Sequence, residues 1–178
     1  STSNYFSRLF FHIVFPIDSD ENIETAELLF DKGFQNLVDT CTLVFEDLND
    51  IKADLTSAFK NYVYYTYDYE IPNVYTFVSG FSYQTFVFQD GAKDGIGIGL
   101  DMFLGLDFPY KHIDPNNPSF SEYLSYFFDK KYLVRKTLFT WVDDKIPLSK
   151  SSKLLDIIVR NGKILFILEN ILPESGKD

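Results

Sequence analysis

Short apolar and aromatic runs, punctuated by Gly, Ser and Asp, occupy the middle of the chain, a pattern of hydrophobic and polar positions typical of strands. The pattern predicts three strands, over Val74–Val78, Tyr83–Gln89 and Ile96–Leu100. Asp-Gly pairs bracket residues 90–95, which predicts a hairpin because these residue types tolerate positive φ. In the third strand, large apolar residues alternate with glycine. One face of that strand therefore packs, while the other lets a group approach the backbone closely.

Before these runs, apolar residues recur in steps of three and four, which is the period of a single helix face. Asp18, Ser19 and Asp20 supply candidates for the N-cap of a helix that begins near Glu21. The polar stretch Asp47–Asp50 predicts a break, so that two helices are expected rather than one. The apolar face comprises Phe30, Phe34, Leu37, Val38, Cys41, Val44, Leu48, Ile51, Leu55, Ala58 and Phe59.

After the strands, the pattern returns to a helical period. The predicted helices are Ser119–Phe128, Lys130–Asp144 and Lys153–Leu172. Ser119 and Glu122 form a capping-box pattern at the start of the first. Residues 106–118 contain three prolines, which predicts a loop between the sheet and these helices. Gly162 interrupts the last helix and is either a tolerated weak point or a site of close helix approach.

Two aromatic segments have less regular patterns. Tyr5–Ile17 is expected to form a strand or an extended lead-in packed on the body. Later, a tyrosine-rich run contains Tyr62, Tyr64, Tyr65, Tyr67 and Tyr69, and the strict alternation of its last three tyrosines predicts an extended segment leading to Pro72. This tyrosine-rich run is either an aromatic platform for a sugar or peptide, or a set of side chains with rings in the core and hydroxyls in water.

The chain has 178 residues, of which 46% are hydrophobic and 18% aromatic, enough for a well-formed core. We therefore expect one α+β domain over residues 1–178, with a small three-stranded sheet or meander packed with several helices. The formal net charge of −10 argues against nucleic-acid binding and against docking on anionic lipid through a basic patch. No apolar run approaches the about 18–20 residues that cross a membrane.

Residues that carry familiar chemistry are sparse. His12 and His112 are the only histidines, and no HExxH, CxxC or EF-hand pattern occurs, so we expect no metal and no cofactor. Asp101, at the end of the glycine-rich strand, either faces a cleft or caps the turn before Phe103, Leu104 and Gly105. Arg135, Arg160 and Asp156 have apolar neighbours on their predicted helices, where a partly buried ion pair is expected.

Three blocks of the sequence resemble the GldB family of gliding-motility lipoproteins. IPNVYTFVSGF at 71–81 fits the family pattern P-x-V-x-T-x-x-SGF, and IGLDMFLG at 98–105 fits IGLD-x-FLG. LLDIIVRNGK at 154–163 fits LLD-x-x-x-x-x-GK. The similarity extends from about Leu48 to Pro173, which is most of the chain.

Members of this family are similar to predicted zinc peptidases of the gluzincin type, so the resemblance implies a gluzincin-like architecture. In those peptidases one helix carries HExxH and a following helix carries a glutamate ligand. By this resemblance Thr140 and Asp144 stand at the histidine positions, Trp141 at the general base and Asn161 at the third ligand. A peptidase-like frame without its metal, and without catalytic activity, is therefore expected. The candidate functional surface comprises Asp101, Trp141, Asp144, Arg160 and Asn161.

The resemblance also implies a location in the cell envelope, on the periplasmic face, with a lipid anchor upstream of Ser1 as the only membrane attachment. The chain is expected to be truncated after Asp178 relative to the family. We expect it to support gliding motility, or the associated secretion machinery, by binding envelope proteins. Two alternatives stay open: an enzyme of unrecognised type with Asp101 at its cleft, and a glycan- or peptide-binding module that uses the tyrosine-rich run.

Overall fold

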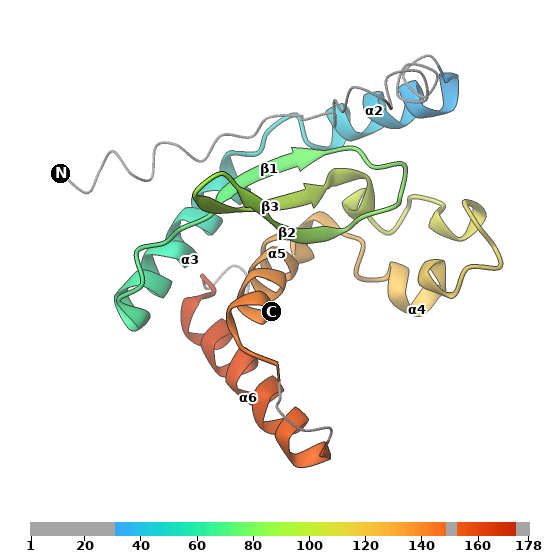
Figure 1. The fold of residues 1–178 in the computed structure, drawn as a ribbon. Helices are drawn as coiled ribbons and strands as arrows, with labels where there is room; N and C mark the ends of the chain where they lie inside the picture. The colour runs from blue at the N-terminus through green and yellow to red at the C-terminus, as the bar shows by residue number, and fades with distance from the viewer. Residues whose placement is uncertain (1–30, 149–152, 174–178) are drawn as a thin grey trace.

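The computed structural model describes residues 31–148 and 153–173 (Figure 1). The expected extended segment Tyr5–Ile17 lies outside the described residues, as does the start of the first predicted helix. The helices and strands confirm the α+β class. They are α2 (Lys32–Val44), α3 (Asn49–Thr66), β1 (Asn73–Phe77), β2 (Thr85–Asp90), β3 (Lys93–Gly99), α4 (Glu122–Ser125), α5 (Lys130–Lys145) and α6 (Leu154–Ile171).

The predicted break separates α2 from α3 within one or two residues of its expected place. The Asp31 side chain caps α2 by accepting a hydrogen bond from the Phe34 N–H at 2.8 Å. Along α3, Leu55, Ala58 and Phe59 are fully buried, as the apolar stripe predicts. The helical period of the sequence therefore identifies the faces of α2 and α3 that form the core.

The extended segment predicted for the tyrosine-rich run is wrong in its first half. α3 continues to Thr66, and Tyr67 ends the helix with φ 57° while its N–H bonds to the Val63 carbonyl. The helix prevails because it buries Tyr62 against Trp141, with ring centroids 4.4 Å apart. The other tyrosines are 56% to 80% exposed, so the expectation of rings in the core is also wrong for them. They are Tyr64, Tyr65, Tyr67 and Tyr69.

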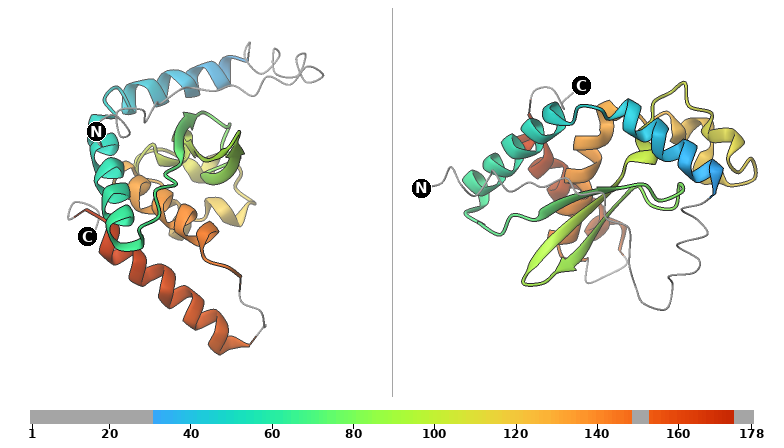
Figure 2. Two further views of the ribbon diagram at one scale, coloured as in Figure 1. Left: turned by 60° about the vertical axis from the view of Figure 1, so that its left-hand side comes forward. Right: turned by 90° about the horizontal axis from the view of Figure 1, so that it is seen from above.

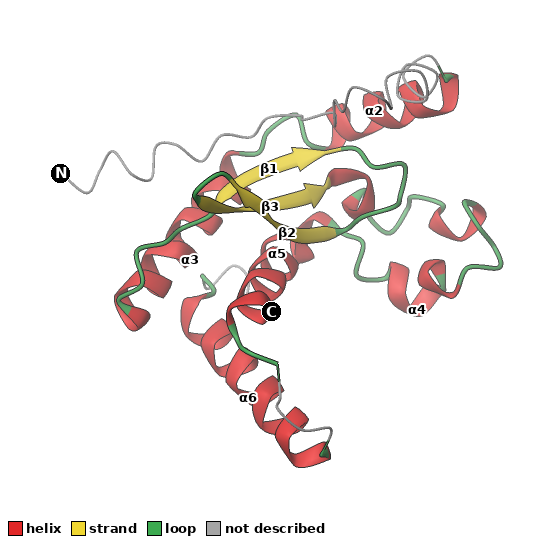
Figure 3. Ribbon diagram, viewed as in Figure 1, coloured by secondary structure: helices red, strands yellow, loops and turns green. Residues whose placement is uncertain are grey.

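The three predicted strands form one sheet in the order β1-β3-β2 (Figure 3). β2 and β3 are antiparallel and joined at Gly91 and Ala92, with Gly91 at φ 62°, as the hairpin prediction requires. β1, however, pairs with β3 in parallel. The meander alternative is therefore wrong. β3 takes the central position, and its Ile96 and Ile98 side chains are fully buried.

The glycine-bearing face of β3 is covered by rings from β2. Phe88 lies opposite Gly95, and Phe86 lies opposite Gly97. A Cβ atom built at Gly95 would come within 2.5 Å of the Phe88 ring, and one at Gly97 within 2.6 Å of the Phe86 ring. The close approach predicted from the glycine spacing is thus made by the protein's own hairpin.

The C-terminal helices α5 and α6 match their predicted ranges closely, whereas α4 is shorter than expected. Ser119 is not the N-cap of α4: it lies in a 3₁₀ turn that begins at Pro118, and Asn117 accepts a hydrogen bond from its N–H. Ser121 takes the N-cap position without a side-chain bond. At Gly162 a built Cβ would meet no atom within 4 Å, so no other helix of the same copy approaches closely at this glycine.

The sheet lies on α5, which packs beneath β2 and β3 and also contacts α3 and α6 (Figure 2). The centre of the core is the interface between α3 and α5. Phe59, Leu138, Trp141 and Val142 are all fully buried there. α5 is therefore the element that connects the sheet with the helical layer.

Candidate functional site

Asp101 follows β3 directly, in the 3₁₀ turn Leu100–Phe103, and it is 0% exposed. Its carboxylate accepts hydrogen bonds from the Ser79 N–H at 3.1 Å, the Phe81 N–H at 2.5 Å and the Ser79 hydroxyl at 3.0 Å. Asp101 therefore lines no open cleft. Its side chain holds the loop after β1 rather than capping the turn before Phe103.

Burial raises the pKa of the Asp101 carboxyl above its ordinary value, and the bonds donated by Phe81 and Ser79 oppose that rise. Tyr110 fixes the same turn from another side. Its hydroxyl donates to the Asp101 carbonyl at 2.9 Å and accepts from the Leu104 N–H at 2.8 Å. The Asp101 carboxylate thus fastens the SGF block to the IGLD-x-FLG block, which gives Asp101 a structural role.

The α5 positions that the resemblance aligns with HExxH differ in their surroundings. The Thr140 hydroxyl lies 2.6 Å from the Thr85 hydroxyl of β2 and 3.1 Å from the carbonyl of Lys136. Trp141 is fully buried, whereas Asp144 is exposed. A carboxylate in place of Trp141 would therefore enter the core rather than face solvent.

Trp141 connects the core with a polar region at the end of α5. Its ring meets Phe59 edge-on at 5.0 Å and Tyr62 at 4.4 Å. The Lys145 ammonium lies 6.0 Å from the ring centroid, at the outer limit of a cation–π contact. The indole N–H is buried and has no hydrogen-bond partner among the described residues. Trp141 therefore contributes packing rather than a polar contact.

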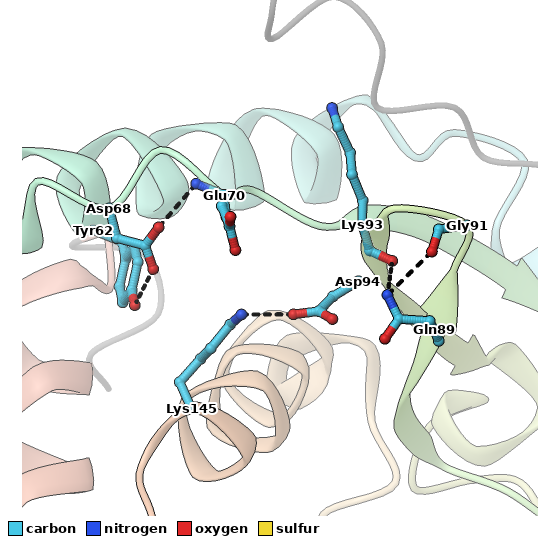
Figure 4. A network of polar contacts seen from close by, with 8 residues as sticks. All are labelled: Tyr62, Asp68, Glu70, Gln89, Gly91, Lys93, Asp94 and Lys145. Atoms are coloured by element: carbon cyan, nitrogen blue, oxygen red, sulfur yellow. Dashed lines mark hydrogen bonds and ion pairs between the residues drawn. The ribbon is translucent and has the colours of Figure 1, made fainter.

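Figure 4 shows a polar cluster near the hairpin, formed by Tyr62, Asp68, Asp94 and Lys145 and called the lysine cluster below. The Lys145 ammonium lies 2.6 Å from the Asp94 carboxylate, and their side chains are 23% and 28% exposed. The Tyr62 hydroxyl donates to Asp68 at 3.2 Å, and Asp68 also accepts from the Glu70 N–H at 2.9 Å. Partial burial works to lower the pKa of Lys145, but the bond to Asp94 and its charge outweigh this and raise the pKa.

Arg160 forms the partly buried ion pair that the sequence predicts. Its guanidinium lies 2.7 Å from the Asp143 carboxylate and donates to the carbonyls of Asp143 at 2.8 Å, Ile146 at 2.9 Å and Pro147 at 3.1 Å. These bonds fix α6 against the end of α5. Asn161, the next residue, is exposed, whereas Asp101 and Trp141 are fully buried.

β2 forms one outer edge of the sheet, close to the lysine cluster. In a hairpin with a two-residue turn, hydrogen-bonded pairs alternate along the strands from the turn onward. The bond from the Gly99 N–H to the Gln84 carbonyl at 2.9 Å fits this alternation. The N–H and C=O groups of Thr85, Val87 and Gln89 therefore point away from β3.

Among the described residues, no group of three or more His, Cys, Asp and Glu side chains is placed to hold a metal ion. His112 is exposed at the end of the 3₁₀ turn Tyr110–His112, and His12 lies outside the described ranges. The site instead contains the Lys145 ammonium, the Asp68 and Asp94 carboxylates and the outer edge of β2. Such groups bind a partner through hydrogen bonds and ion pairs.

The sequence did not single out Lys145 or Asp68, and it indicated Asp94 only as part of the hairpin. Lys145 and Asp94 are 51 positions apart, so no local spacing indicates that they meet. Charged residues at a helix end and beside a turn are also typical of solvated surface. The pairing follows only from the way α5 passes beneath the hairpin.

One comparison with known proteins gives a match. The family model described as gliding motility protein GldB matches residues 1–178, the whole of the chain. No curated protein and no solved structure matches it.

Proposed function

Because the chain belongs to the GldB family of gliding motility proteins, we propose that it is a non-catalytic, peptidase-like domain that acts by binding another protein. Membership implies a part in gliding motility, and this family of lipoproteins implies a location in the cell envelope. In the described part of the chain, no helix is long and apolar enough to cross a membrane. An upstream lipid anchor would hold the domain on the periplasmic face, beside the motility or secretion machinery.

The observation that carries this proposal is what surrounds the α5 positions aligned with HExxH. The Thr140 hydroxyl is engaged with Thr85, and Trp141 fills the core between α3 and α5. Catalytic zinc needs three protein ligands and an open position for water. Of the aligned positions on α5, Asp144 alone combines exposure with a side chain that binds metals. The fold is therefore better suited to presenting a binding surface than to catalysing peptide hydrolysis.

The outer edge of β2 supplies a surface for such binding. An extended segment of a partner can add to a sheet edge through main-chain hydrogen bonds, while nearby side chains give specificity. Thr85, Val87 and Gln89 present the main-chain groups, and Asp94 and Lys145 lie close by with charges that solvent reaches. We assign the partner-binding role to this edge together with the lysine cluster.

Replacement of Gln89 by proline tests this assignment. Proline removes the outward N–H and keeps the bonds that pair β2 with β3, because edge positions with an outward N–H tolerate proline. Gln89→Ala is the matched control, since it removes the same side chain and keeps the N–H. Each variant would replace the wild-type protein in a gliding bacterium. Motility and the set of co-purified envelope proteins would then be measured.

We expect the Gln89→Pro strain to lose gliding and a co-purified envelope protein, while the Gln89→Ala strain keeps both. Equal protein levels in the two strains exclude a folding defect. Normal gliding with an unchanged set of partners in the proline strain would contradict the assignment to β2. Recovery of no envelope partner with the wild-type protein would contradict the binding function itself.

A second candidate function rests on the tyrosine-rich run. Four of its tyrosines are more than half exposed, which suits a platform for a glycan or peptide. Tyr64 and Tyr65 are in edge-to-face contact, with centroids 5.1 Å apart. Titration with cell-wall fragments should change the tyrosine fluorescence if this function holds, and Tyr67→Ala with Tyr69→Ala should weaken the change. An unchanged spectrum would remove this candidate.

A further inference from the structure

α6 carries a large apolar surface on the side that faces away from the core. Its buried residues are Ile164, Leu168 and Ile171, all in the C-terminal half of the helix. The N-terminal half projects from the rest of the molecule (Figures 1 and 2). Six large side chains, 48% to 72% exposed, form what we call the α6 apolar face. They are Leu154, Leu155, Ile158, Val159, Leu165 and Phe166.

The spacing of the last four of these residues is self-complementary. Gly162 lies midway between Ile158 and Phe166 and also midway between Val159 and Leu165. A twofold axis through Gly162 would therefore place Ile158 of one copy against Phe166 of the partner subunit in an antiparallel pair of helices. At Gly162 itself nothing lies within 4 Å of a built Cβ, and small residues at a crossing point let two helices approach closely.

The size of the surface fits an association of two copies. With their exposed fractions, the six side chains leave roughly 700 Å² open on each copy, close to the about 800 Å² per partner of a standard interface. Single copies rarely expose contiguous apolar patches of this size without an interaction role. The Arg160 bonds to Asp143 and Ile146 fix the rotation of α6, so the apolar face is held outward.

We propose that two copies of this chain associate through the α6 apolar face, as an antiparallel helix pair centred on Gly162. The interface lies on α6, whereas the proposed partner-binding surface consists of β2 and the lysine cluster. Each copy of the pair therefore keeps its proposed partner-binding edge. This inference is independent of which envelope protein is bound.

Sedimentation and light scattering of the purified chain over a range of concentrations test the proposal, since association follows mass action. The wild-type chain is expected to reach twice the mass of one copy. Ile158→Lys and Phe166→Glu, each alone, are expected to give a single copy. Mixed in equal amounts, these two variants should form a pair again, because the lysine then faces the glutamate of the partner.

Leu43→Glu is the matched control, since Leu43 is 78% exposed on α2 and should not change the mass. Circular dichroism checks that each variant is folded. A single-copy mass of the wild type at every concentration would overturn the proposal. So would a pair that survives both α6 substitutions, or variants that do not recover a pair on mixing. Binding of single wild-type copies to lipid vesicles, lost in Ile158→Lys, would overturn it in favour of a membrane surface.

Discussion

Asp94 and Asp101 lie at opposite ends of β3, and the chain surrounds them differently. Asp101 is fully buried and accepts its hydrogen bonds from Ser79 and Phe81 in the loop after β1. Asp94 is 28% exposed and pairs with Lys145 of α5. One end of the strand is thus closed by the chain itself. At the other end, charged groups stay within reach of solvent and of a partner.

The difference separates a structural carboxylate from one that is available for recognition. A buried N–H left without an acceptor costs the full desolvation penalty, so the donors around Asp101 depend on it. A partly exposed ion pair contributes little to stability because water and salt screen it. Substitutions at the two ends should therefore differ in what they change.

The largest effect is expected for Asp101→Ala. The substitution leaves the partly buried N–H groups of Ser79 and Phe81 without their acceptor and opens a cavity at a fully buried position, which should lower the free energy of unfolding by about 3 kcal/mol. Urea denaturation measures the change. Asp107→Ala, at an exposed carboxylate of the following loop, is the control and should stay within about 0.5 kcal/mol of wild type. A loss below about 1 kcal/mol for Asp101→Ala would contradict its structural role.

A smaller effect is expected for Lys145→Met at the open end. The pair with Asp94 is partly exposed, so its loss should cost below about 1 kcal/mol at neutral pH. In the wild type the raised pKa of Lys145 means that this contribution is fully present below the ordinary lysine pKa, and is lost as the pH rises through the folded-state value. Urea denaturation at neutral and strongly alkaline pH should therefore give a smaller difference at alkaline pH.

Lys111→Met, at an exposed lysine of the loop, controls for loss of a charge and should show no such pH dependence. A difference between wild type and Lys145→Met that grows with rising pH would contradict the pairing. A loss as large as that of Asp101→Ala would also remove the contrast between the two ends of β3.

Treatment that removes metal ions is expected to have no measurable effect on the protein, the smallest effect of the series. Native protein should contain no stoichiometric zinc after gel filtration, and a chelator should leave its melting temperature unchanged. Elemental analysis measures the first and thermal unfolding the second. As a positive control, Thr140→His with Asp144→His and Asn161→Glu should retain more zinc, because two histidines four positions apart share one helix face. One equivalent of zinc in the native protein would contradict the proposed absence of a metal site.

The sequence predicts the elements of the fold better than their arrangement. The apolar stripe from Phe34 to Phe59 and the glycine spacing of β3 are local patterns, and both describe the structure well. The parallel pairing of β1 with β3 has no such local signal, since the residue pattern of a strand does not depend on whether it pairs in parallel or antiparallel. The tyrosine-rich run misleads because an alternation of three tyrosines is too short to outweigh the burial of Tyr62 against Trp141.

The candidate site could be predicted only in part for the same reason. The end of a glycine-rich strand indicates that Asp101 matters, but its donors come from Ser79 and Phe81, about twenty positions earlier. Arg160 was expected in a partly buried pair, and its partner Asp143 lies 17 positions away on α5. Contacts of this range follow from the packing of elements, which single-sequence periodicity does not describe.

The rings of Phe86 and Phe88 occupy the space where side chains at Gly97 and Gly95 would otherwise stand. Neither member of such a pair can change freely by itself. A larger residue at the glycine needs a smaller one at the phenylalanine, and a lost ring leaves the backbone of β3 open to water. Across related chains, these two pairs should therefore vary jointly, and the hairpin should be inherited as a unit rather than residue by residue.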